Sequence, residues 1–224
     1  MTKILPLGVF LALSLFLPGV IAQEQAAGTA DTTAHGVVRG ATMEVMAVVQ
    51  EAHTYADEDP ERYYEQVLAV LDPVVDFRGF ARSVMGPYAS SERYRSLDEG
   101  GRAQLRNQLD MFTEVMRTGL IRTYSKGLLA FGGSRIEVSE TSPDEASQSR
   151  VSVQQLIYSD ATEPYMVLYQ MGRDKQGQWK LRNMIIESVN LGEIYRSQFE
   201  AAARQHEGDL DQVIAGWSTE ALET

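Results

Sequence analysis

The sequence predicts an α+β protein: N-terminal helices, then one twisted antiparallel sheet of four strands, then C-terminal helices that pack back on it. Three observations predict this order. Apolar residues recur at intervals of three and four from Val37 to about residue 125, which is the period of amphipathic helices. Between residues 134 and 190, β-branched and aromatic residues alternate with polar ones, as in strands. From residue 191 onward the helical spacing returns.

Residues 1–22 have the pattern of a secretory signal peptide. Lys3 precedes an apolar run that Pro18 and Gly19 interrupt near its end, and Val20 and Ala22 stand at the spacing of a cleavage site. We therefore expect cleavage before Gln23 and export of the mature chain. A permanent membrane anchor is the alternative, because the run is near the lower length limit for a span. Residues 23–36 are small and polar and predict a disordered leader, which leaves residues 37–222 as the folded domain.

The first helices can be placed from their start signals. The pattern from Val37 predicts a first helix, and Pro60 after Asp59 fits the first turn of a second one. Asp76 favours a new start into the segment FRGFARSVMG. The longest helix is expected around residues 97–125, about 40 Å long, with one wide apolar stripe and Gly119 inside it.

Four segments predict strands: SRIEVSE, RVSVQQLIYS, EPYMVLYQM and QWKLRNMIIESVN. The links between them are turn-rich, and strands joined by short links form an antiparallel meander most simply. A helix carrying Ile194 and Phe199 follows, and Asp209 is a candidate N-cap for a last helix that buries Val213 and Trp217.

Composition and motifs exclude several classes of function. The net charge of −11 argues against a nucleic-acid partner, which would require a basic face. The chain has no cysteine, so disulfides, thiolate metal sites and cysteine nucleophiles are excluded. The three histidines form no metal-ligand motif, and neither a nucleophile elbow nor a phosphate-binding glycine loop is present. We expect no cofactor and no metal.

What remains unexplained is an excess of apolar residues on the predicted sheet and on the long helix. Tyr165, Val167, Tyr169 and Met171 share one strand face, and a face of that content must be covered. An ordinary core between helices and sheet would account for the excess, and so would a ligand cavity. Periodicity does not separate the two.

Four segments carry a family resemblance. They are WKLRNMIIESVNLGEIYRSQF at residues 179–199, GDLDQVIAGW at 208–217, DFRGFARSVMGPYAS at 76–90 and RTGLIRTYS at 117–125. In this order and spacing, behind a signal peptide, the chain resembles the MlaC family, also called the toluene-tolerance family, over about residues 37–222. In the first segment the pattern consists of Trp179, Asn183, Ile185, Glu187, Val189, Asn190, Arg196 and Phe199.

The resemblance implies a periplasmic phospholipid-binding protein of an ABC-type lipid transport system that maintains outer-membrane lipid asymmetry. It implies a twisted antiparallel sheet and helices that enclose an apolar cavity for acyl chains, with the phosphate head group near the surface. The implied partners are phospholipid, an outer-membrane lipoprotein complex and an inner-membrane ABC transporter with MCE domains. The resemblance implies no catalytic residue.

Site residues follow from this expectation. Those expected in the acyl-chain walls are Phe112, Met116, Leu120 and Tyr124 from the long helix, with Val153, Tyr165, Val167, Tyr169, Met184 and Ile186 from the sheet. Arg122, Lys126 and Arg135 stand near the link from the long helix to the sheet and are candidates for the head group, with solvated surface cations as the alternative.

Two other functions stay open. A carrier of the same superfamily could bind a hopanoid or another lipid. An enzyme could use the same cavity for a small hydrophobic substrate, which would require a carboxylate or histidine with a perturbed pKa inside it. Asp76 and Glu187 are the candidates for that role, although Asp76 also fits a helix cap and Glu187 a surface residue at the end of the sheet.

Overall fold

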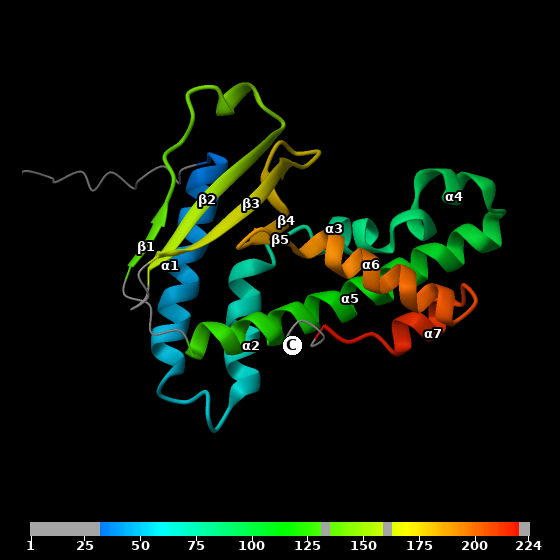
Figure 1. Cartoon of the computed structure of the whole chain (residues 1–224), viewed down its shortest axis with the longest axis horizontal. Helices are drawn as coiled ribbons and strands as arrows, with labels where there is room; N and C mark the ends of the chain where they lie inside the picture. The colour runs from blue at the N-terminus through cyan, green and yellow to red at the C-terminus, as the bar shows by residue number, and fades with distance from the viewer. Residues whose placement is uncertain (1–31, 131–134, 159–162, 220–224) are drawn as a thin grey trace, which may run out of the picture.

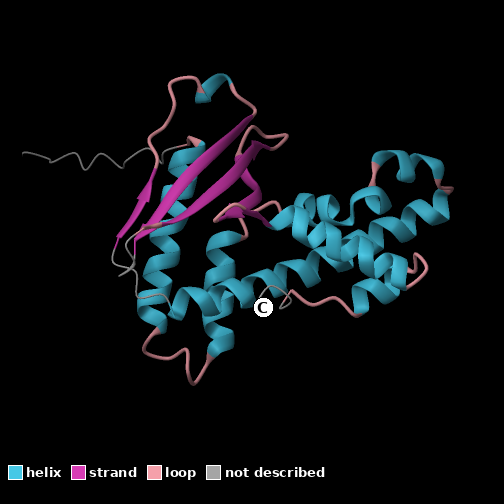
Figure 2. Cartoon of the chain, in the orientation of Figure 1, coloured by secondary structure: helices cyan, strands magenta, loops and turns pink. Residues whose placement is uncertain are grey.

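The computed structural model describes residues 32–130, 135–158 and 163–219. Figure 1 shows an elongated molecule in which the sheet, α1 and α2 form one end and α3, α4, α6 and α7 gather at the other. The long helix α5 runs through both ends, and Figure 2 shows the strands together on one side of α1 and α2. The α+β prediction is confirmed. The predicted signal peptide, residues 1–22, lies outside the described residues.

The first helix, α1 (Ala34–Ala52), begins three residues before the predicted start. Ala34 and His35 are buried, so residues 34–36 belong to the fold and not to a disordered leader. Glu145, from the loop between the first two strands, holds this end in place. Its carboxylate accepts from the backbone N–H of Ala34 and lies 2.5 Å from Nδ1 of His35. This long-range contact is the reason that the leader prediction, made from composition, was wrong at residues 34–36.

The next helices begin at the predicted caps. α2 (Pro60–Leu71) starts with Pro60 in its first turn, and the side chain of Asp59 accepts from the N–H of Arg62 at 3.2 Å. α3 (Phe77–Met85) is capped by Asp76, which accepts from the N–H of Gly79 at 2.9 Å. A short 3₁₀ helix, η1 (Gly86–Ala89), and α4 (Ser91–Ser96) lead into the long helix.

The long helix, α5 (Glu99–Ala130), has 32 residues and is therefore about 48 Å long. Its first half packs against α6 (Leu191–Gln205) and α7 (Leu210–Ala215), which Asp209 caps as predicted. At Gly119, α5 meets the C-terminal segment: a Cβ placed there would come within 2.4 Å of the Thr219 hydroxyl. The glycine allows this close approach.

The sheet has five strands in the order β1-β2-β3-β4-β5, all antiparallel, and not the four that were predicted. Their bounds are β1 (Arg135–Val138), β2 (Arg150–Tyr158), β3 (Tyr165–Arg173), β4 (Trp179–Ile186) and β5 (Val189–Asn190). The fifth strand arises because Glu187 and Ser188 form a two-residue turn with positive φ angles of 46° and 70°. Such turns usually carry Asn-Gly or Asp-Gly, so the Glu-Ser pair gave no signal and β4 and β5 were predicted as one strand.

A β-bulge in β4 decides which of its side chains face the helices. Gln170 pairs with Asn183, and the next residue of β3, Met171, pairs with Leu181, so Arg182 is an extra residue in the ladder. Leu181 and Met184, three positions apart, consequently stand on the same face of the sheet as Met171, and all three line the same space.

Candidate functional site

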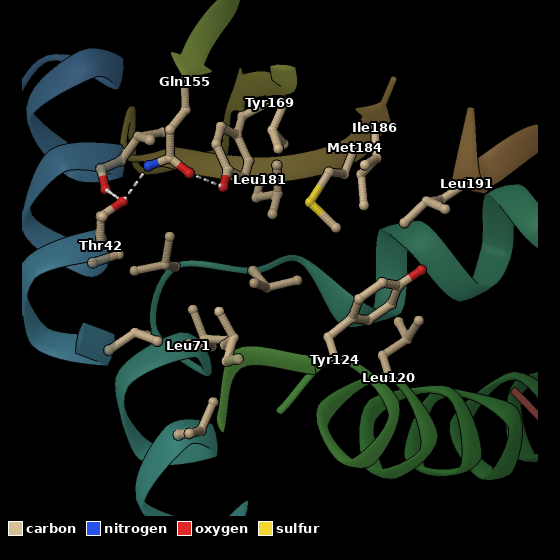
Figure 3. A pocket seen from close by; sticks show the side chains of 18 of the residues that line it. Thr42, Leu71, Leu120, Tyr124, Gln155, Tyr169, Leu181, Met184, Ile186 and Leu191 are labelled. Carbon is tan, nitrogen blue, oxygen red and sulfur yellow. Dashed lines mark hydrogen bonds between the residues drawn. The ribbon is translucent and has the colours of Figure 1, made fainter. Parts of the chain in front are cut away.

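A cavity of about 570 Å³ lies between one face of the sheet and the helices α1, α2, α3 and α5. Figure 3 shows side chains from both sides pointing into it. The lining is almost entirely apolar. It consists of Val38, Ala41, Thr42, Val45 and Met46 of α1; Val67 and Leu71 of α2; Val74, Val75, Phe77 and Phe80; Leu120, Ile121, Tyr124, Ser125, Gly127 and Leu128 of α5; Ile136, Gln155, Ile157, Tyr165, Val167, Tyr169, Met171, Leu181, Arg182, Asn183, Met184 and Ile186 of the sheet; and Leu191.

The strand register explains why the sheet presents an apolar wall. Ile136 pairs with Ile157, which pairs with Tyr165, and these three form one row across β1, β2 and β3. A second row joins Val167 to Ile186. Successive rows are two residues apart along each strand. Because side chains of a strand alternate between the two faces of the sheet, the lining side chains of both rows lie on the same face. The apolar alternation in the sequence is the source of this wall.

One polar chain interrupts the apolar lining (Figure 3). The hydroxyl of Tyr169 donates to Oε1 of Gln155 at 2.8 Å, and Nε2 of Gln155 donates to Oγ1 of Thr42 at 2.8 Å. The Thr42 hydroxyl in turn donates to the carbonyl of Val38 at 2.8 Å. Burial raises the pKa of the Tyr169 phenol, so it stays neutral at physiological pH. The chain therefore satisfies its own polar groups without adding charge to the cavity.

Arg182, the one cation among the described lining residues, is already paired. The guanidinium of Arg182, which the bulge brings to the cavity, forms an ion pair with Asp76 and donates to the carbonyl of Arg173 at 3.3 Å. Asp76 uses its other oxygen to cap α3. Within the described part of the chain, no aspartate, glutamate, histidine or lysine lines the cavity. The lining thus offers apolar contact and little charge.

No cluster of described residues has the composition of a metal site. In the same ranges, no helix is both long and apolar enough to cross a membrane.

A comparison with protein-family models identifies the family. A family model described as "MlaC protein" matches residues 39–219. The chain belongs to the MlaC family. A curated MlaC relative is "Toluene tolerance protein ttg2D" of Pseudomonas putida, 29% identical over 188 residues, which cover 84% of this chain and 81% of that protein. The fold is similar to that of a phospholipid-binding protein from Ralstonia solanacearum, solved in complex with a phospholipid: the TM-score is 0.64 at 19% identity, over 82% of this chain and 97% of that one.

In this MlaC chain, seven of the ten residues expected in the acyl-chain walls lie in the lining of the cavity. They are Leu120, Tyr124, Tyr165, Val167, Tyr169, Met184 and Ile186. They come from α5, β3 and β4, and the register brings them to one space although up to 66 residues separate them in the chain. That these side chains contact lipid stays a prediction.

The other three do not reach the cavity, which corrects the expectation for them. Phe112 and Met116 are fully buried one to two turns earlier on α5, where the Phe112 ring packs against Phe199 at a centroid distance of 4.9 Å. Val153 has the expected strand face, but the start of α1 covers it in a cluster with Ala34 and Val38. Periodicity identifies the face of an element and does not show how far along it the cavity extends.

The three head-group candidates are not brought together at the lining. Arg122 makes two hydrogen bonds to Glu61, of 2.7 and 2.5 Å, on the exposed side of α5. Lys126 is exposed on the same helix. Arg135 pairs with Glu137 at 3.2 Å and stacks on the ring of Tyr158, and it lines a smaller groove beside the cavity.

The two carboxylates considered for catalysis have other partners. Asp76 caps α3 and pairs with Arg182 at the edge of the cavity. Glu187 is exposed in the turn after β4, where its side chain accepts from the N–H of Met166. Neither is among the lining residues.

Sequence analysis missed the contributions of α1 and α2 to the lining, as well as Gln155 and Arg182. The helical pattern marked Val45 and Val67 as apolar, but nothing in it separated a cavity wall from a core. Arg182 has the same strand parity as Met184 and Ile186, but a cation in an apolar wall is not expected without the Asp76 carboxylate that pairs with it, 106 residues earlier in the chain.

Proposed function

We propose that this protein is a periplasmic carrier that encloses the acyl chains of a phospholipid in the cavity and shuttles the lipid between membranes. The observation that carries the proposal is the volume of about 570 Å³ with an almost wholly apolar lining. Protein interiors are close-packed, and a dry void of this size would cost on the order of 10 kcal/mol, as much as the whole stability of a domain. A space of this kind therefore has a ligand.

The chemistry of the lining specifies the class of ligand. Tyr124 and Tyr169 stay neutral because burial raises their pKa values, and Arg182, the one cation among the described lining residues, is paired with Asp76. Such a wall favours hydrocarbon. The relatives support the same class, since the neighbour from Ralstonia solanacearum holds a phospholipid and the relative from Pseudomonas putida is a toluene tolerance protein.

The energetics explain why lipid transport needs a protein of this kind. Burying one methylene is worth about 0.8 kcal/mol, so exposing two long acyl chains with ~28 methylenes would cost more than 20 kcal/mol. A carrier that covers the chains removes this barrier without making or breaking a bond. For this reason we propose a function that requires no catalytic residue, and the absence of a carboxylate from the described lining supports it.

The proposal includes the compartment and the partners. The pattern of residues 1–22 supports export by a cleaved signal peptide. Membership in the MlaC family supports an outer-membrane lipoprotein complex and an inner-membrane ABC transporter with MCE domains as donor and acceptor of the lipid.

Native mass spectrometry of the mature protein, purified gently from a bacterial periplasm, tests the proposal. We expect a co-purifying species with the mass of an intact phospholipid, and extraction then identifies its head group and chains. A bound hopanoid in place of a phospholipid would support the function as a lipid carrier and identify a different lipid as its ligand. Two results would contradict the proposal: a bound lipid that has been hydrolysed, or a protein that is purified without bound lipid and takes up none from vesicles.

A further inference from the structure

A second, smaller groove opens beside the cavity, between α1 and the edge strand β1. Thr42, Met46 and Ile136 line both spaces, so the groove and the cavity adjoin each other at these three side chains. β1 is the outer strand of the sheet and has a paired neighbour on one side only, which leaves α1 as the other wall of the groove. The groove therefore lies at the surface directly beside the cavity.

Two arginines flank this groove. Arg39 of α1 and Arg135 of β1 both line the groove, together with the strongly exposed side chain of Met43. In a chain with a net charge of −11, this groove brings two cations together, of which Arg135 is paired with Glu137. The guanidinium groups of arginines present planar pairs of donors that match the oxygens of a phosphate.

Among its described lining residues, the main cavity offers a phosphate no unpaired cation, and its unpartnered polar group is the neutral, buried hydroxyl of Ser125. Arg182 is engaged by the carboxylate of Asp76, and replacing that partner would uncap α3. Gln155 and Thr42 are occupied in the chain of hydrogen bonds across the wall. A charged head group inside the cavity would be desolvated with no unpaired cation to compensate it, which favours a position where the cavity meets water.

Arg135 can change its partner at little cost. Its pair with Glu137 joins two side chains that are 60% and 49% exposed, and exposed pairs of this kind contribute about 0 to 1 kcal/mol to stability.

The strand register places Arg135 at the end of the sheet where a lining residue of the cavity is exposed to solvent. Arg135 pairs with Tyr158, next to the Ile157–Tyr165 pair, and Tyr165 lines the cavity while 52% of its surface stays exposed. The cavity is thus open at the end of the sheet where Arg135 lies.

We infer that the slot between α1 and β1 is the port through which the head group of the bound phospholipid reaches solvent, and that Arg39 and Arg135 bind its phosphodiester. This inference rests on the proposed function and adds to it a residue-level site. It moves the expected head-group contact away from Arg122 and Lys126, which lie on α5 and line neither space.

A binding experiment with two lipids tests the port. The probes are phosphatidylglycerol and a diacylglycerol with the same chains, each offered in neutral carrier vesicles. The Arg39→Gln/Arg135→Gln double variant should lose on the order of tenfold or more in affinity for phosphatidylglycerol and bind diacylglycerol as the wild type does. Arg122→Gln is the matched control, because it removes an exposed arginine outside the groove. Equal losses in the control, or no loss in the double variant, would overturn the port. A wild-type protein that binds neither lipid would instead refute the proposed function.

The absence of cysteine from the chain permits a direct test of position. Met43→Cys places a thiol at the groove, and Met111→Cys places one at another exposed methionine, on α5. When each variant is loaded with a phospholipid that carries a maleimide on its head group through a short linker, we expect adduct formation at position 43 and not at position 111. Equal labelling of the two variants, or no labelling of either although both retain the lipid, would contradict the inference.

Discussion

Nε2 of Gln155 donates a hydrogen bond of 2.8 Å to Oγ1 of Thr42, and this bond ties β2 to α1 across the wall of an apolar cavity. Gln155 is 3% exposed, so its amide has little access to water and depends on its protein partners. The other end of the amide accepts from Tyr169. The hydrogen bond between Gln155 and Thr42 holds α1 against the sheet. This helix forms one side of both the cavity and the groove.

We expect Gln155→Leu to lower the free energy of unfolding by about 1–3 kcal/mol, because the buried Tyr169 hydroxyl loses its acceptor. Denaturant unfolding followed by circular dichroism measures this change. The double variant Gln155→Leu/Tyr169→Phe removes both polar groups and should recover part of the loss. Wild-type stability for the single variant would show that the hydrogen-bond chain does not stabilise the fold.

A charge placed in the cavity should abolish lipid retention. Val167→Arg and Leu120→Arg each bring a guanidinium to an apolar wall, one from the sheet and one from α5. Met111→Arg on the exposed side of α5 is the control and should retain lipid. Native mass spectrometry gives the lipid content, and circular dichroism verifies that each variant is folded. Normal lipid content in both folded cavity variants would mean that the ligand binds elsewhere.

Two glycine substitutions should have opposite effects. Gly119→Ala should destabilise the protein by about 1–3 kcal/mol, because the new methyl group overlaps Thr219, whose hydroxyl would lie 2.4 Å from it. Gly40→Ala, in the interior of α1 with no atom within 4 Å, should stabilise it by up to about 1 kcal/mol. The midpoints of thermal unfolding compare the two. Equal effects would indicate that the contact between α5 and the C-terminal segment is loose.

Tyr63 gives the fold a dependence on alkaline pH. Burial raises its pKa from 10.0 to about 12, so between these values the unfolded chain releases a proton that the folded chain retains. Its contribution to stability is therefore complete below pH 10 and is lost as the pH rises toward 12. Tyr63→Phe also removes the hydrogen bond of 3.0 Å to the carbonyl of Ser125, which costs about 1 kcal/mol at pH 7.

The stability difference between wild type and Tyr63→Phe should accordingly shrink from pH 9 to pH 11.5, as denaturant titrations at several pH values would measure. Tyr165→Phe, which removes the hydroxyl of an exposed side chain, serves as the control for the loss of a phenol. A difference that stays constant over the whole range would contradict the assignment.

Much of the fold could be predicted because its signals are local. Asp59, Asp76 and Asp209 cap helices through hydrogen bonds that span two or three residues, and Pro60 marks a first turn. The strands were visible because Val167 and its neighbours alternate over the length of β3. Each of these features is determined by residues within one or two turns of the chain.

What could not be predicted depends on contacts between distant segments. Glu145 holds the start of α1 from 110 residues away along the chain, and composition alone made that start appear disordered. Phe112 and Leu120 belong to one apolar stripe, yet one is in the core and the other in the cavity wall, since α6 packs against α5 at Phe112. The division between core and cavity is a property of the assembled elements.

The extra residue in β4 also constrains how this strand can change. Upstream of Arg182 the odd-numbered position 181 faces the cavity, and downstream the even-numbered positions 184 and 186 do. The strand therefore carries two phases of one alternating pattern, joined at a single position. Deleting Arg182 would join the two phases into one regular alternation in which Leu181, Met184 and Ile186 still face the cavity, but Asp76 would lose its ion-pair partner. The extra residue of β4 therefore serves to place the Arg182 guanidinium beside Asp76, whereas the apolar wall does not depend on it.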